Sequence, residues 1–186
     1  MRAARIVAVV VAVLALSGSA AASRLPTAPR CPIFPPSNPW NRRVDKLPVA
    51  ASSETLIRSI GLDTGLHADF GSGSWDGGPI GIPFDVVTRR TPRAKVSFEY
   101  ADESDHVGYP IPRRVHIEYG SDHHALLVDR DACRLYELGG LTRSRGRWHA
   151  WAGATWSLRS NRVRPASWTS TDAAGRSSRG SRVGTR

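Results

Sequence analysis

The chain has 186 residues, of which 26 are basic and 16 acidic, and its formal net charge is +10. Six of the arginines lie in residues 1–22 and 176–186, which contain no acid, so 20 basic and 16 acidic residues remain, a net charge of +4. No run of Lys and Arg is interleaved with aromatic residues, which argues against a nucleic-acid-binding protein. Weak attraction to anionic polymers of a cell envelope is compatible with this charge.

Residues 1–22 have the pattern of a secretory signal peptide. Two arginines precede an apolar run at 6–16, and three alanines at 20–22 form a small-residue cleavage site before Ser23. The apolar run is too short to span a bilayer, and no later stretch resembles a membrane helix. We therefore expect a secreted, extracytoplasmic protein that does not span a membrane.

A Pro-rich segment without periodicity follows at residues 23–37, which predicts an extended N-terminal stretch. It contains Cys31, and the second of the two cysteines is Cys133. Because exported proteins form disulfides, we predict a bridge between Cys31 and Cys133 that ties this stretch to the domain. Two free thiols, or pairing with another molecule, are the alternatives.

Residues 53–60 are the best helix candidate. Leu56, Ile57 and Ile60 recur with helical spacing on one face, and Gly61 stands where helices commonly end. The pattern therefore predicts one short helix.

A long loop is predicted at residues 62–83, where six glycines and two prolines indicate several turns. It lacks the Lys-Ser/Thr ending of a phosphate-binding loop. It carries His67, Asp69 and Trp75, and loops of this length often serve function. His67 and Asp69, together with His124, are the candidate groups of a metal-dependent hydrolase, and a wrapped surface loop is the alternative.

Two short strands are predicted next, at residues 84–87 and 95–100. In the second strand Val96, Phe98 and Tyr100 alternate with polar residues, which is typical of a strand with one buried face.

An acidic turn follows this strand at residues 101–105. Asp102 and Glu103, with Asp105, are candidate binding residues, because Ca²⁺ prefers several oxygen ligands. The spacing of an EF-hand is absent, so a solvated turn is the alternative.

The stretch 115–138 contains the clearest strand patterns. Apolar and polar residues alternate over 115–119, a continuous apolar run covers 125–128, and 133–138 follows an Asp-rich turn. We predict three short strands here, of which the last two form a hairpin.

The same stretch holds the candidates for catalysis, His124, Asp122 and Asp129. In an extended strand that begins by Asp122, Asp122 and His124 share one face, whereas His123 and Asp129 share the other. A histidine oriented by a carboxylate can act as a general acid or base. We assign these roles first to His124 with Asp122, and a capped turn with solvated histidines is the alternative.

A last strand is predicted within residues 148–159. The chain has six Trp but only four Phe, and exposed Trp faces are surfaces on which sugar rings stack. Trp75, Trp148 and Trp156 are therefore candidate binding residues, with burial in the core as the alternative for each.

Several short strands separated by turns, without alternation of helices and strands, predict an all-β fold. We expect a sandwich or jelly-roll-like arrangement with one short helix and long Gly/Pro loops. The β-rich domain is predicted at residues 38–175 and a basic, disordered tail at 176–186.

Several segments have distinctive residues: NPWN (38–41), SIGLDTGLHADFGSGSWDGGPIGIPF (59–84), FEYADESD (98–105), YPIP (109–112), GSDHHALLVDRDACRLYEL (120–138) and RSNRVRPASWTSTDAAG (159–175). Through them the chain resembles a family of uncharacterised secreted bacterial proteins that are frequent in actinobacteria. The resemblance implies no activity. Members continue well past Gly175, so it implies an incomplete domain, and our hypothesis is a frameshift. Members more often have a single His, matching His124, with Arg in place of His123.

Export, tryptophan abundance, and carboxylate and His groups near turns predict a carbohydrate-active protein that acts on polysaccharide of the cell envelope or outside the cell. A non-catalytic secreted binding or structural module is the alternative, and a metal-dependent hydrolase is a third hypothesis. The sequence identifies no cofactor.

Overall fold

The computed structural model describes residues 22–65, 73–75, 77–166 and 168. The predicted signal peptide, apart from residue 22, lies outside these residues. So do His67, Asp69 and the predicted basic tail at 176–186.

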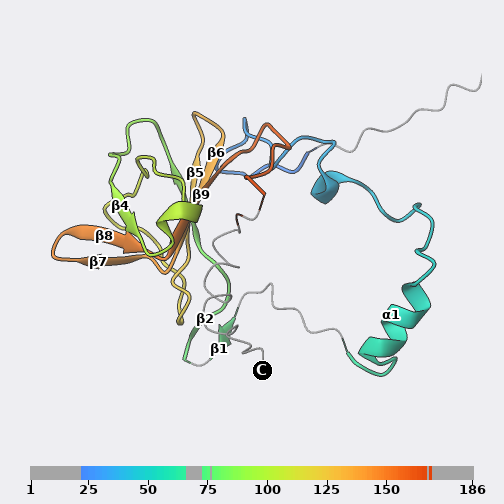
Figure 1. Ribbon diagram of the computed structural model, residues 1–186. Coiled ribbons are helices and arrows are strands. Elements are labelled where there is room, and N and C mark those ends of the chain that lie inside the picture. The colour runs from blue at the N-terminus through green and yellow to red at the C-terminus, as the bar shows by residue number, and fades with distance from the viewer. Residues whose placement is uncertain (1–21, 66–72, 76, 167, 169–186) are drawn as a thin grey trace, which may run out of the picture.

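Strands dominate the described chain and form two main sheets, which confirms the predicted all-β fold (Figure 1). The four-stranded sheet has the order β3 (Phe84–Val87), β5 (Ala125–Asp129), β6 (Arg134–Gly139) and β9 (Ala152–Ser157). The three-stranded sheet has the order β4 (Val96–Phe98), β8 (Arg147–Ala150) and β7 (Thr142–Ser144). The smaller elements are β1 (Ser74–Trp75) paired with β2 (Gly78–Pro79), the helix α1 (Ser53–Ile60), and the 3-10 turns η1 (Pro39–Asn41) and η2 (Ala101–Glu103).

Both main sheets are mixed. In the larger sheet β3 runs parallel to β5, whereas β6 is antiparallel to both β5 and β9. In the smaller sheet β4 is parallel to β8, and β7 is antiparallel to β8. The predicted hairpin is thus present as β5 and β6.

The two sheets pack against each other through one apolar core. The larger sheet contributes buried residues such as Leu127 and Leu138, and Ala150 and Phe98 pack from the smaller sheet. Tyr109 is fully buried between them, and its ring meets the rings of Phe98 and Tyr136 edge-on, at centroid distances of 5.8 and 5.7 Å. Its hydroxyl donates to the Asp105 carbonyl, and burial raises the pKa of Tyr109 above its ordinary value.

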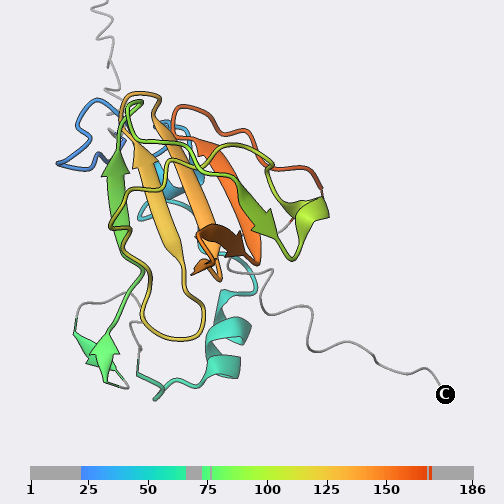
Figure 2. The same cartoon turned by 90° about the vertical axis from the view of Figure 1, so that its left-hand side faces the viewer.

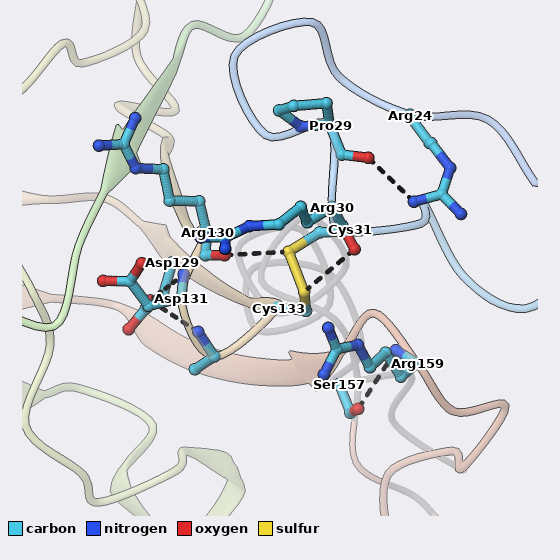
Figure 3. The surroundings of a disulfide bond; sticks show 11 residues. Arg24, Pro29, Arg30, Cys31, Asp129, Arg130, Asp131, Cys133, Ser157 and Arg159 are labelled. Carbon is cyan, nitrogen blue, oxygen red and sulfur yellow. Dashed lines mark hydrogen bonds between the residues drawn. A yellow bond between two sulfur atoms is a disulfide. The ribbon is translucent and has the colours of Figure 1, made fainter.

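The N-terminal segment covers the other face of the larger sheet. Figure 1 shows this segment, in blue, and the three-stranded sheet on opposite sides of β5, β6 and β9. Ala28 and Cys31 form a second apolar cluster with Val128, Cys133 and Leu158. The predicted disulfide between Cys31 and Cys133 is present, with the Cα atoms 5.2 Å apart, and it joins this segment to the turn between β5 and β6 (Figure 3).

The helix α1 has the predicted bounds, but it lies apart from both sheets (Figures 1 and 2). Leu56, Ile57 and Ile60 form the predicted apolar face, and each is more than half exposed. Periodicity therefore predicted the helix correctly, without indicating what its apolar face contacts.

The strand predicted at residues 115–119 is wrong. Val115 and Ile117 do pack against the core, but Tyr119 is 52% exposed. β3 is the edge strand of the larger sheet, and this stretch contacts it through side-chain hydrogen bonds and not through a strand ladder. The His116 N–H donates instead to the Asp85 carboxylate at 2.9 Å.

The last strand predicted within 148–159 is present as β9, and the same range also contains most of β8, an unpredicted strand of the other sheet. The chain bends at Trp151, whose backbone N–H donates to the Gly139 carbonyl at 2.7 Å. The strands β1, β2 and β7 were not predicted, since each has only two or three residues.

Gly153 offers a test of the core. A Cβ at this position in β9 would clash with the Tyr109 hydroxyl and lie 2.7 Å from Phe98 Cε1. Overpacking of this kind costs about 1–3 kcal/mol. We expect Gly153→Ala to lower the free energy of unfolding by that amount in urea denaturation, with Ser144→Ala on exposed β7 as the neutral control. Equal midpoints would contradict this packing.

The disulfide closes a long loop, with 102 residues of sequence separation. In the chain-entropy model such a cross-link stabilises the folded state by about 4–5 kcal/mol. We expect the double variant Cys31→Ser/Cys133→Ser to unfold at a much lower denaturant concentration than the oxidised protein. The reduced wild type should match the variant, and if oxidised and reduced protein unfold alike, the cross-link does not stabilise this fold.

Candidate functional site

His124 lies immediately before β5, is buried, and is paired with Glu118. Its Nδ1 is hydrogen-bonded to Glu118 Oε2, and the Glu118 N–H donates to the His124 carbonyl at 2.8 Å. A carboxylate does orient this histidine, but it is Glu118, which the sequence analysis did not assign. Because its imidazole is only 5% exposed, His124 meets the solvent little.

The prediction that Asp122 and His124 share one face of an extended strand is wrong. The strand β5 begins at Ala125, and His123 has a positive φ of 48°, so the alternation of faces does not extend back to Asp122. Asp122 is half-buried; its carbonyl accepts from the Gly140 N–H at 2.8 Å, and its Oδ1 accepts from the Ser121 hydroxyl at 3.2 Å. A role for Asp122 in acid–base chemistry stays a prediction.

Asp129 ends β5 and is buried in a polar network. Its Oδ2 accepts from Arg93 at 3.0 Å, and its Oδ1 accepts from the backbone N–H groups of Asp131 and Ala132, both at 3.0 Å. Arg93 also donates to the Tyr136 hydroxyl at 2.5 Å. This arrangement neutralises a buried carboxylate and holds the turn between β5 and β6, next to Cys133 (Figure 3).

The acidic turn does not gather its carboxylates around one point. Asp102 and Glu103 lie in η2, and the Glu103 carbonyl accepts from Arg164 at 2.7 Å. The Asp105 carboxylate accepts from the Thr155 N–H at 2.7 Å. Among the described residues, no three His, Cys, Asp or Glu side chains are placed to hold a metal ion.

The three predicted tryptophans lie at separate places. Trp75 is in β1, and its side chain is outside the described part of the structure. Trp148 is half-buried against the core, with the Arg143 guanidinium 5.3 Å from its ring centroid. Trp156 is half-buried, and its Nε1 is buried without a hydrogen-bond partner among the described residues.

A pocket of about 390 Å³ lies over the three-stranded sheet, and its chemistry is mixed. The lining combines an indole, an imidazole, a carboxylate and two hydroxyls with small and apolar groups: Ser97, Phe98, Glu99, Gly140, Thr142, His149, Ala150 and Trp151. The volume lies within the range of small-molecule sites.

Strand register brings the polar members of this lining together. Ser97 of β4 is paired with His149 of β8, which is paired on its other side with Thr142 of β7. The neighbours of Ser97 and His149 along each strand pack into the core, so these two side chains point to the open face. Glu99 follows Ser97 by two residues and therefore lies on the same side.

Ser97 and His149 are hydrogen-bonded to each other. Ser97 Oγ lies 2.6 Å from His149 Nδ1 and 3.2 Å from the Trp148 carbonyl oxygen, and both side chains are exposed. A serine hydroxyl in contact with an imidazole is the arrangement that activates a nucleophile.

Gly140 positions the tryptophan of the pocket. Its φ is +65°, and a Cβ there would lie 2.6 Å from Trp151 Cε2, so the indole packs directly on the glycine backbone. The Trp151 ring is thus held at the pocket from one side while remaining half-exposed.

Local sequence patterns do not identify this site. Alternation over residues 95–100 predicted that Ser97 lies on the polar face of its strand. The structure confirms this, because Ser97 is exposed while Val96 and Phe98 are partly buried. No signal in the sequence joins Ser97 to His149, which is 52 residues away. The sequence also does not show that the chain bends at Trp151.

Comparisons with protein families, with curated proteins and with solved structures found no match. Within the described residues, no helix has the length and apolar character needed to cross a membrane.

The hydrogen bonds of Asp129 indicate a structural role for this residue, and a stability measurement can test it. Truncation in Asp129→Ala leaves Arg93 and two turn N–H groups without their acceptor. We expect a loss of about 2–4 kcal/mol in the free energy of unfolding, discounted because Arg93 is partly solvated. Chemical denaturation measures it, with Asp102→Ala on the exposed turn as the control. Unchanged stability would argue against this role.

Proposed function

We propose that this is an exported carbohydrate-active protein that holds polysaccharide in the pocket over the three-stranded sheet. One observation carries the proposal: the Trp151 indole lines the same pocket as the polar side chains of Ser97, Glu99, Thr142 and His149. Sugar rings have apolar C–H faces and hydroxyl edges. An aromatic ring suits the faces, and convergent polar groups suit the hydroxyls.

The charge of the lining favours a neutral glycan. Among the described residues, Glu99 brings the pocket its only carboxylate, and none of the lining residues is Lys or Arg. An anionic sugar would therefore meet repulsion without a compensating cation. A carboxylate and an imidazole both hydrogen-bond hydroxyl groups readily.

Export is part of the proposal. It rests on the signal-peptide pattern of residues 1–22 and is supported by the Cys31–Cys133 disulfide, since such bonds persist in oxidising compartments. A non-catalytic secreted binding module is the alternative. Retention on a polysaccharide without release of any product would favour it.

The pocket tryptophan can be tested directly. We expect Trp151→Ala to weaken retention on neutral insoluble polysaccharides at least about tenfold, which corresponds to 1.4 kcal/mol of lost contact. A pull-down across a panel of polysaccharides measures it. The matched control is Trp40→Ala in η1, which removes an 88% exposed indole that does not line the pocket. Equal loss in both variants, or none in either, would refute the assignment.

A further inference from the structure

We infer that Ser97 and His149 form a nucleophile–base pair that hydrolyses acyl esters, and that its substrate is an O-acyl group on a sugar. The choice of a sugar ester, in contrast to an ester of another alcohol, rests on the proposed function. The nucleophile–base assignment itself rests on the geometry of the two side chains.

Ser97 and His149 are in direct contact. With neutral His149 protonated on Nε2, Nδ1 is an acceptor, and the Ser97 hydroxyl donates to it over 2.6 Å. The alternative acceptor, the Trp148 carbonyl oxygen, is farther away at 3.2 Å. The shorter contact directs the hydroxyl proton toward a base that can remove it.

Ser97 and His149 lie where a substrate can reach them. Both side chains are exposed on β4 and β8, while their strand neighbours Val96, Phe98 and Ala150 pack in the core. The pair is therefore not needed to fill space. It lies in the wall of a pocket, where a substrate can reach it.

The reaction balances with water as the co-reactant. Ser97 Oγ attacks the ester carbonyl carbon while His149 Nδ1 takes the hydroxyl proton. The bond from this carbon to the alkoxy oxygen then breaks, and the proton passes from His149 to the leaving sugar hydroxyl. Water attacks the acyl-serine, gives its proton to His149, and releases the carboxylic acid as Ser97 regains its hydrogen.

Two further polar residues line the same pocket. Glu99 brings a carboxylate, whose negative charge is opposite to that of an imidazolium. Thr142 is paired with His149 in register on the side away from Ser97, and its hydroxyl can hydrogen-bond a sugar hydroxyl.

The first experiment needs no sugar. The full chain is incubated with p-nitrophenyl acetate, and we expect turnover that falls at least about 100-fold in Ser97→Ala and in His149→Ala. The controls are Ser144→Ala on exposed β7 and His116→Ala, whose imidazole pairs with Asp85 outside the pocket. No turnover by the wild type, or full turnover by Ser97→Ala, overturns the pair.

A second measurement does not depend on how well a variant folds. A fluorophosphonate probe should label the wild-type chain once, and peptide mass spectrometry should place the label on Ser97. Absence of label, or label on another residue, overturns the assignment.

A third measurement separates the two proposals. Acetylated xylan and its deacetylated form are offered to the wild type, and we expect acetate release from the first and retention on both. Retention without release or labelling overturns the nucleophile–base pair and leaves the sugar site. The opposite result is a protein that is labelled and turns over p-nitrophenyl acetate but is not retained on xylan and releases no acetate from it. That result supports the pair and overturns the proposed sugar function.

Discussion

The arrangement of the pocket depends on the burial of one face of the three-stranded sheet. Val96 and Phe98 of β4, and Trp148 and Ala150 of β8, pack into the core between the sheets. Burying one large apolar side chain is worth about 1.5–3 kcal/mol, so the inward face of both strands is strongly specified. A shift by one residue would exchange the faces. The outward positions of Ser97 and His149 follow from this constraint.

Parallel register then determines which outward side chains meet. Ser97 of β4 and His149 of β8 are separated by 52 residues in the sequence, yet they are direct neighbours in the sheet. Thr142 extends the same row onto β7. After β8 the bend at Trp151 sends the chain into the larger sheet, which brings an indole to the edge of that row. Packing and polar chemistry are thus separated onto opposite faces of one small sheet.

The opposite side of the molecule is organised for stability. The disulfide joins the N-terminal segment to the turn between β5 and β6, and Asp129 with Arg93 holds the same turn from within. Here the ionised carboxylate of Asp129 is buried and both of its oxygens accept hydrogen bonds, as a folded core requires. The buried carboxylate of Asp129 contrasts with the exposed polar groups of the pocket, which is why these two sets of residues suit different tasks.

The sequence by itself determined the elements whose cause is local. Helical spacing predicted α1, alternation predicted the buried face of β4, and two cysteines after a predicted signal peptide predicted the bridge. Local patterns failed at residues 115–119, where the His116 N–H donates to the Asp85 side chain of the edge strand β3 and not to its backbone. They also paired His124 with Asp122, because a strand was extended back through His123, which has a positive φ.

Only the tertiary structure decided which polar groups come together. The partners of His124 and His149, Glu118 and Ser97, are chosen by how the chain folds back and how the sheets pack. Periodicity along a chain reports the face on which a residue lies. It carries no information about the strand that will lie beside it, since that choice depends on burying apolar area contributed by distant segments.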